Sequence, residues 1–219
     1  MKRFSVALLC IPCLFSGMTL AAPNPVQFSD NWAIGFSYGQ AEPIGMLRAR
    51  YLPTSSFALG LTNTSFDHHD VRGYLEYLDL GRTNHERLHY DDIQMRLQIL
   101  GLGVDWLYRP LAQNTGRRLD LFVGGGLQLD YWKNERDTYE VVVDSTESFM
   151  VEGLTRQEAA WGFGFSAGAN YRFLRHMSLD LELSYRVIMA SLWPALDMRL
   201  ESVDGFQFLR YAIGISYVW

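Results

Sequence analysis

The chain has 219 residues, of which 48% are hydrophobic and 14% aromatic, and a formal net charge of −5 at pH 7. This length fits a single domain. The acidic balance excludes the clustered basic surface on which nucleic-acid binding depends. No stretch beyond the N-terminal region approaches the about 20 consecutive apolar residues of a membrane-spanning helix, so the apolar side chains must be organised in another way.

The N-terminus has the order of a secretory signal peptide. Lys2 and Arg3 precede an apolar run over residues 6–15, and small residues follow. We expect cleavage after Ala21, because a cut one residue later would leave Pro23 in the first mature position. The sequence therefore predicts a signal peptide over 1–21 and export by the Sec route.

The mature chain, residues 22–219, forms one predicted domain. Both cysteines, Cys10 and Cys13, lie in the removed segment, so we expect no disulfide and no cysteine metal site. Loss of the two basic residues of the signal leaves 17 basic against 24 acidic residues, a charge of −7.

Segments of about ten residues with alternating apolar and polar side chains recur along the mature chain, as is typical of a transmembrane β-barrel. In residues 31–40, Trp32, Ile34, Phe36 and Tyr38 share one face. The expected strands are 31–40, 44–52, one beginning at Phe57, 93–108, 118–132, 161–171, 179–187 and 209–219. Eight strands predict an all-β, antiparallel up-and-down barrel of the smallest outer-membrane class.

Two of these strands are irregular. Over 44–52, Leu47, Ala49 and Tyr51 are expected to face lipid and Arg48 and Arg50 to face inward. Over 93–108, the apolar parity changes between Ile99 and Leu100, which predicts a β-bulge.

The connections predict the orientation, since such barrels join strands by short periplasmic turns and longer external loops and finish in the periplasm. The short links are expected at 52–56, 109–116 and 174–177. The long external segments are expected at 66–92, 133–158 and 190–206. The first two external segments read as hairpins: 73–80 and 86–90 flank a turn, as do 138–143 and 148–151.

The last eleven residues alternate large apolar side chains with small or polar ones and end on an aromatic residue. They resemble the C-terminal assembly signal of bacterial outer-membrane barrels, with Gly214, Tyr217 and Trp219 in its characteristic places. In architecture the mature chain is similar to the small eight-stranded barrels typified by the OmpA transmembrane domain, OmpX and OmpW. That resemblance implies recognition by the barrel-assembly machinery and integral residence in the outer membrane of a Gram-negative bacterium, among its lipids and lipopolysaccharide.

Charged side chains on the inward face are expected to fill the lumen, because an eight-stranded interior has room only for side chains. Interlocked ion pairs would satisfy these charges, and a narrow gated pore or a small-ligand pocket is the alternative. The predicted network consists of Arg48, Arg50, Arg96, Asp105, Asp130, Asp180, Glu182, Arg186 and Arg210.

Histidines offer the alternative of an outer-membrane hydrolase acting on lipid or peptide. Those in the predicted external segment, with nearby aspartates, could form a hydrolytic dyad or a loose metal site, but no spacing fixes two ligands on one element. They are His68, His69, His85, His89, Asp70, Asp91 and Asp92. The pair His176 and Ser178 is similar to that of lipid A deacylases, yet it falls at a periplasmic turn.

The sequence thus predicts a non-enzymatic outer-membrane barrel without metal or cofactor and with a structural or surface-interaction role. A surface partner would meet the external hairpins. A small channel or carrier for hydrophobic compounds is the remaining alternative.

Overall fold

A computed structural model describes residues 32–66, 68–86, 93–111, 118–144, 147–192 and 203–219. The predicted signal peptide, together with His89, Asp91 and Asp92, lies outside the described residues. Within the described part, no helix is long and apolar enough to cross a membrane.

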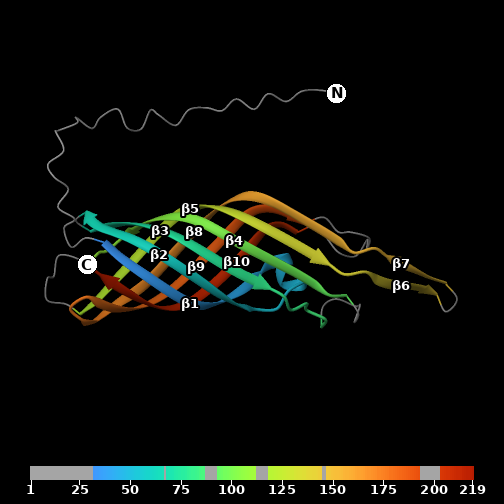
Figure 1. Ribbon diagram of the computed structural model, residues 1–219, viewed down its shortest axis with the longest axis horizontal. Helices are drawn as coiled ribbons and strands as arrows, with labels where there is room; N and C mark the ends of the chain where they lie inside the picture. Colours follow the sequence, from blue (N-terminus) through green and yellow to red (C-terminus); the bar gives the residue numbers. More distant parts are fainter. Residues whose placement is uncertain (1–31, 67, 87–92, 112–117, 145–146, 193–202) are drawn as a thin grey trace, which may run out of the picture.

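Eight antiparallel strands form a closed barrel, in which the first strand pairs with the last (Figure 1). In spatial order the strands are β1 (Trp32–Ile44), β10 (Val203–Val218), β9 (Met177–Leu192), β8 (Leu154–Leu174), β5 (Leu119–Arg136), β4 (Met95–Tyr108), β3 (His69–Leu80) and β2 (Thr54–Phe66). A separate hairpin of β6 (Tyr139–Asp144) and β7 (Glu147–Val151) and a short 3-10 helix, η1 (Gly45–Ala49), complete the described structure. The predicted fold class is confirmed.

The strands turn apolar side chains outward and polar ones inward. On β10, Tyr211, Ile213 and Ile215 are half exposed on the outer surface, while Arg210 is buried in the lumen. The same alternation runs through β5 and β9, as the sequence predicts. An outer surface of leucines and aromatic residues is stable in lipid and not in water, because exposed apolar area costs about 25 cal/mol per Å² in water.

The second predicted strand is wrong. Ile44 ends β1, and residues 45–52 form η1 and a loop; this segment starts at Gly45, whose φ of +61° interrupts an extended strand. Leu47 and Tyr51 then turn inward and are fully buried, so they cap the barrel instead of facing lipid. The Tyr51 hydroxyl receives a hydrogen bond from Asn134, and burial raises the pKa of the phenol above its usual range.

The missing barrel strand is β3, which the sequence suggests as one arm of an external hairpin. Its outward residues include Leu75 and Tyr77, and its inward residues include Tyr74 and Glu76. The eight-strand count therefore holds with a different second and third strand.

This change relocates the first connections. The β2–β3 turn lies at the same end as the C-terminus. At this end the Arg109 amide donates to the His68 carbonyl at 2.7 Å, and the Val218 amide donates to the His176 carbonyl at 2.8 Å. The predicted external segment 66–92 is thus wrong in its first part, and the link 52–56 belongs to the opposite end. Because such barrels have short periplasmic turns, we take the end with the short β8–β9 turn, which is also that of the C-terminus, as the periplasmic one.

The predicted β-bulge is also wrong. β4 pairs with β3 and β5 without a register shift. Met95, Leu97 and Ile99 face the lumen, where they join an apolar core at the outer end of the barrel. This core also includes Trp132 and Phe206, whose rings meet edge to face at 5.3 Å. The parity changes because the lumen itself changes from apolar to polar along the strand.

Candidate functional site: the barrel lumen

A layer of charged side chains fills the lumen below the apolar core. The inward positions of four strands supply it: Arg72 and Glu76 on β3, Asp105 on β4, Glu182 and Arg186 on β9, and Arg210 on β10. Each faces inward because it alternates with a lipid-facing neighbour on its strand.

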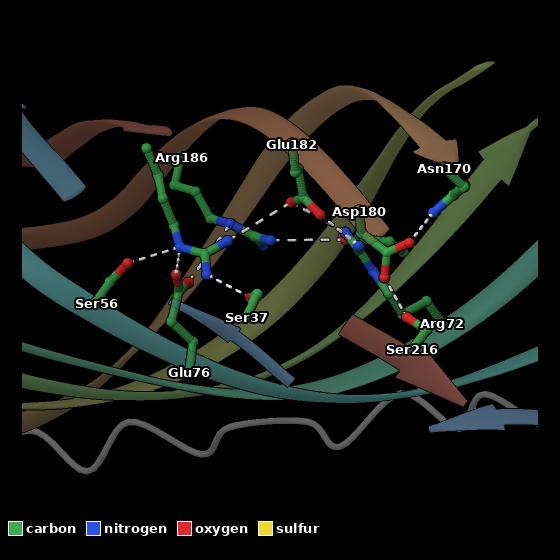
Figure 2. Close-up of polar contacts among 11 residues, drawn as sticks. Ser37, Ser56, Arg72, Glu76, Asn170, Asp180, Glu182, Arg186 and Ser216 are labelled. Carbon is green, nitrogen blue, oxygen red and sulfur yellow. Dashed lines mark hydrogen bonds and ion pairs between the residues drawn. The ribbon is translucent and has the colours of Figure 1, made fainter. Parts of the chain in front are cut away.

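The three arginines and three carboxylates interlock (Figure 2). Arg72 donates to Glu182 at 2.5 Å and to Asp105 at 2.7 Å. Since β3 and β9 lie four places apart in a ring of eight strands, the bond from Arg72 to Glu182 crosses the full lumen.

The other two arginines strengthen the layer. Arg210 Nε lies 2.9 Å from Glu76 Oε1, and its guanidinium also donates to Ser56 and Ser37, each at 2.7 Å. Arg186 lies 3.7 Å from Glu76 and 3.6 Å from Asp105.

Arg186 is further held by neutral partners. It donates to Gln128 at 2.8 Å and lies 4.3 Å from the centre of the Tyr74 ring. Gly103 leaves the room that this ring needs, because a Cβ there would fall 2.3 Å from the Tyr74 hydroxyl. Such a connected set of charge-assisted bonds closes the lumen at this level.

The predicted network residues fall into three groups. Asp105, Glu182, Arg186 and Arg210 occupy the interlocked layer. Asp130 and Asp180 are in the lumen but have no ion pair among the described residues.

The predicted arginines of the first loop and β4 are misplaced. Arg48 lies on η1, 3.8 Å from Glu42 and largely exposed, and Arg50 is buried in the cap. Arg96 pairs with Asp79 on the outer surface, with half of its side chain exposed. Without a bulge in β4, Arg96 has outward parity, and without a strand over 44–52 the other two have no lumen face.

Sequence reasoning missed Arg72 and Glu76, the centre of the layer. The signal was present in β3, where Asp70, Arg72 and Glu76 fall on one parity with Leu75 and Tyr77 on the other.

A cavity of about 520 Å³ lies on the periplasmic side of the charged layer. At its wall, Arg109 bridges Asp70 and Asp120, the latter at 2.7 Å, and so joins three strands. Arg118, Arg172 and Asp180 also line the cavity. Small residues of β1 and β10, among them Gly35 and Gly214, leave this space open.

The histidines that the structure describes near this end are held by structural contacts. His68 Nδ1 lies 3.1 Å from the Arg109 carbonyl oxygen, and His69 Nδ1 accepts from the Trp106 indole at 2.9 Å. His176 Nδ1 lies 3.0 Å from the Val218 carbonyl oxygen, while Ser178 donates to an aspartate. Within the described part of the chain, no group of three potential ligands gathers to hold a metal ion.

Comparison with solved structures agrees with this architecture. Neisserial surface protein A superposes with a TM-score of 0.56 at 11% identity, over 87% of this chain and 98% of that one. A major outer membrane protein from Thermus thermophilus superposes with a TM-score of 0.50 at 14% identity, over 86% of this chain and 99% of that one. The outer membrane protease OmpT from Escherichia coli reaches only 0.47 at 8% identity, over 87% and 97%, and carries no inference about activity.

These likenesses concern the fold alone. No family model matches the chain, and no curated protein matches its sequence. The apolar outer surface, the polar lumen and the shared architecture together define the class: the chain is an eight-stranded β-barrel of the outer-membrane type, integral to that membrane.

Proposed function

We propose that the protein is a sealed structural barrel that presents the β6–β7 hairpin to a partner at the cell surface. The observation that carries this proposal is the position of the hairpin, which projects beyond the barrel at the end opposite the C-terminus (Figure 1). A spanning strand needs about 9–11 residues, yet β5 has 18 and β8 has 21, and both continue toward the hairpin.

The hairpin is built as an ordered extension. β5 and β8 stay paired as far as Arg136 and Leu154. At the base, Arg136 donates to the Glu152 carbonyl at 2.9 Å, and the Gly153 amide donates to Thr138 Oγ1 at 3.1 Å. A preordered element loses less conformational entropy when it binds.

The hairpin also offers a means of recognition. Among the described residues, β6 and β7 pair only with each other, so each has one edge that no other described strand covers. An extended segment of a partner can add to such an edge as a further strand. Met150, with 64% of its surface exposed, provides an apolar contact beside the edge.

The closed lumen supports this function over that of a channel. The interlocked arginines and carboxylates cross the lumen, and the apolar core fills its outer end. A solute would have to displace both layers in order to pass.

The test is to shorten the hairpin. Residues 137–153 are replaced by an Asn-Gly turn joining β5 to β8. Cells that display the shortened protein and cells that display the intact protein are then compared for adhesion to a protein-coated surface and to a bare surface. A matched control keeps the hairpin and carries Arg175→Gln, in the exposed turn at the opposite end of the barrel. We expect the shortened protein to insert and to remain heat-modifiable in gels but to lose adhesion, whereas the control keeps most of it. Undiminished adhesion of the shortened protein would contradict the proposal.

A further inference from the structure

The periplasmic cavity is a closed-ended space. Its outer side is the charged layer of Arg72, Arg186 and Arg210 with their carboxylates, and its other end faces the periplasm. A volume of about 520 Å³ lies within the range of small-molecule sites, about 300–1,000 Å³. The cavity can therefore hold a solute without conducting it.

Most of the charges that line the cavity are already paired. Arg72, Arg186 and Arg210 contact carboxylates of the layer, and Arg109 contacts two aspartates. Among the described residues, three lining charges have no ion-pair partner: Arg118, Arg172 and Asp180. These three define what a ligand must supply.

The two arginines are neighbours across one ladder. Leu119 pairs with Tyr171, and the Arg172 amide donates to the Arg118 carbonyl at 2.7 Å, so the two side chains leave adjacent strands at the same level. Like charges directly opposite each other destabilise a sheet. An anion bound between them removes this repulsion, and the planar guanidinium matches a carboxylate or a phosphate.

Asp180 lies deeper and, among the described residues, accepts hydrogen bonds only from neutral groups (Figure 2). Its Oδ1 accepts from Asn170 at 2.5 Å and from Ser178 at 3.1 Å, and its Oδ2 accepts from Ser216. An ionised carboxylate has about four acceptor positions, so one remains on Oδ2. A ligand ammonium would supply both the missing donor and the missing positive charge.

The strand register sets the spacing of these two poles. Asn170 pairs directly with Asp180, and Arg172 is two residues nearer the periplasmic end of the same strand, about 6.6 Å further along. The carboxylate therefore lies inside and the arginine pair at the mouth.

We propose that this cavity binds a small zwitterionic solute of the periplasm, with its amine at Asp180 and its carboxylate or phosphate at Arg118 and Arg172. The lining carries both signs of charge in nearly equal number, which disfavours a polyanion. An amine and an acid separated by several bonds fit the two poles better than an α-amino acid does. This site is at the opposite end of the barrel from the hairpin and is independent of the function proposed for it.

Isothermal titration of the purified full-length barrel in detergent tests the proposal with matched probes. 4-Aminobutyrate and phosphoethanolamine carry both charges, butyrate carries only the acid, and butylammonium carries only the amine. We expect each single-charge probe to bind about tenfold or more weakly than 4-aminobutyrate, the effect of losing one charge-assisted hydrogen bond. Equal affinity for butyrate and 4-aminobutyrate, or no binding of any probe, overturns the proposal.

Variants assign the two poles. Asp180→Asn should reduce the affinity for 4-aminobutyrate to that for butyrate, and the double change Arg118→Gln with Arg172→Gln should reduce it to that for butylammonium. Arg175→Gln, exposed in the adjacent turn and outside the cavity lining, is the matched control and should change nothing. An Asp180→Asn protein that folds and keeps full affinity for 4-aminobutyrate refutes the amine pole.

Two further conditions keep the test decisive. If Asp180→Asn does not fold, the arginine double variant tests the site alone, because its side chains are exposed at the mouth. Titration in nanodiscs with and without phosphatidylethanolamine identifies the source of the zwitterion. Competition by this lipid assigns the site to its headgroup and overturns the free solute, whereas unchanged affinity supports the free solute.

Discussion

Replacing Arg210 by methionine tests whether the charged layer stabilises the barrel. Arg210 Nε and Glu76 Oε1 are 2.9 Å apart, and their side chains are only 3% and 6% exposed. At this distance the attraction is about 6 kcal/mol for an effective dielectric constant of about 20. Repulsion from nearby Arg186 disappears with the substitution, so we expect a net loss of about 3–5 kcal/mol, the usual cost of an uncompensated buried charge.

The partner substitution separates the pair from its surroundings. In the double variant Arg210→Met with Glu76→Gln, neither charge remains to be left alone in the lumen. We expect this variant to be more stable than Arg210→Met, with a coupling energy of about 1–3 kcal/mol.

Arg96→Met is the matched control. Its pair with Asp79 lies on the outer surface with half of the arginine side chain exposed, so its loss should cost no more than about 1 kcal/mol. The same substitution should therefore cost more stability at the lumen position Arg210 than at the surface position Arg96, which the sequence also assigned to the lumen.

Equilibrium unfolding by urea, followed by tryptophan fluorescence in detergent micelles, measures all these variants, with gel mobility before and after boiling as a check of folding. The reasoning is refuted if Arg210→Met costs no more than Arg96→Met, or if the effects of the Arg210 and Glu76 substitutions simply add.

Three further predictions concern the membrane barrel. Changing Tyr217 and Trp219 together to charged residues should block assembly, since both lie exposed at the lipid-facing end of the closing strand; normal insertion of heat-modifiable protein would count against this. Leu102→Arg, at a position 62% exposed in the middle of β4, should cost about 2–4 kcal/mol in the same urea titration, and an effect near zero would place β4 away from lipid. Purified protein in planar bilayers should show no large, stable conductance, because the hydrogen bond from Arg72 to Glu182 crosses the lumen and blocks the passage of ions. A large, stable conductance would contradict this assignment.

The parts of strands in which the lumen face is polar could be predicted from the sequence. β9 places Asp180, Glu182 and Arg186 on one parity and leucines on the other, so its alternation is unmistakable. β4 fails this test, because its outer half turns Leu97 and Ile99 into the lumen. Apolar residues on both faces of one strand produce the same sequence pattern as a β-bulge. Because a bulge is predicted, Arg96 is expected to face the lumen, whereas it faces outward.

The charged layer could be predicted in kind but not in its pairing. Within a correctly assigned strand, alternation predicts which arginines face inward. The ion-pair partner of each arginine depends instead on which strands lie across the barrel. Arg72 and Glu182 are 110 positions apart and meet only because β3 and β9 are opposite. The misreading of 44–52 as a strand put β2 in third place instead of second, so it also hid β3 as the source of two central residues.

Hydration accounts for how these side chains are distributed along the lumen. An eight-stranded interior must be filled, and the end capped by η1 is filled by apolar side chains that need no partners. In the next layer Asp105 is 2% exposed and has two arginines within 4 Å, which compensate its buried charge. Among the described residues, Arg118 and Arg172 have no ion-pair partner, and both lie exposed at the periplasmic mouth, where water can solvate them. A charge that water solvates costs little free energy to leave unpaired and remains available to a ligand, which is why we place the proposed solute site at this end.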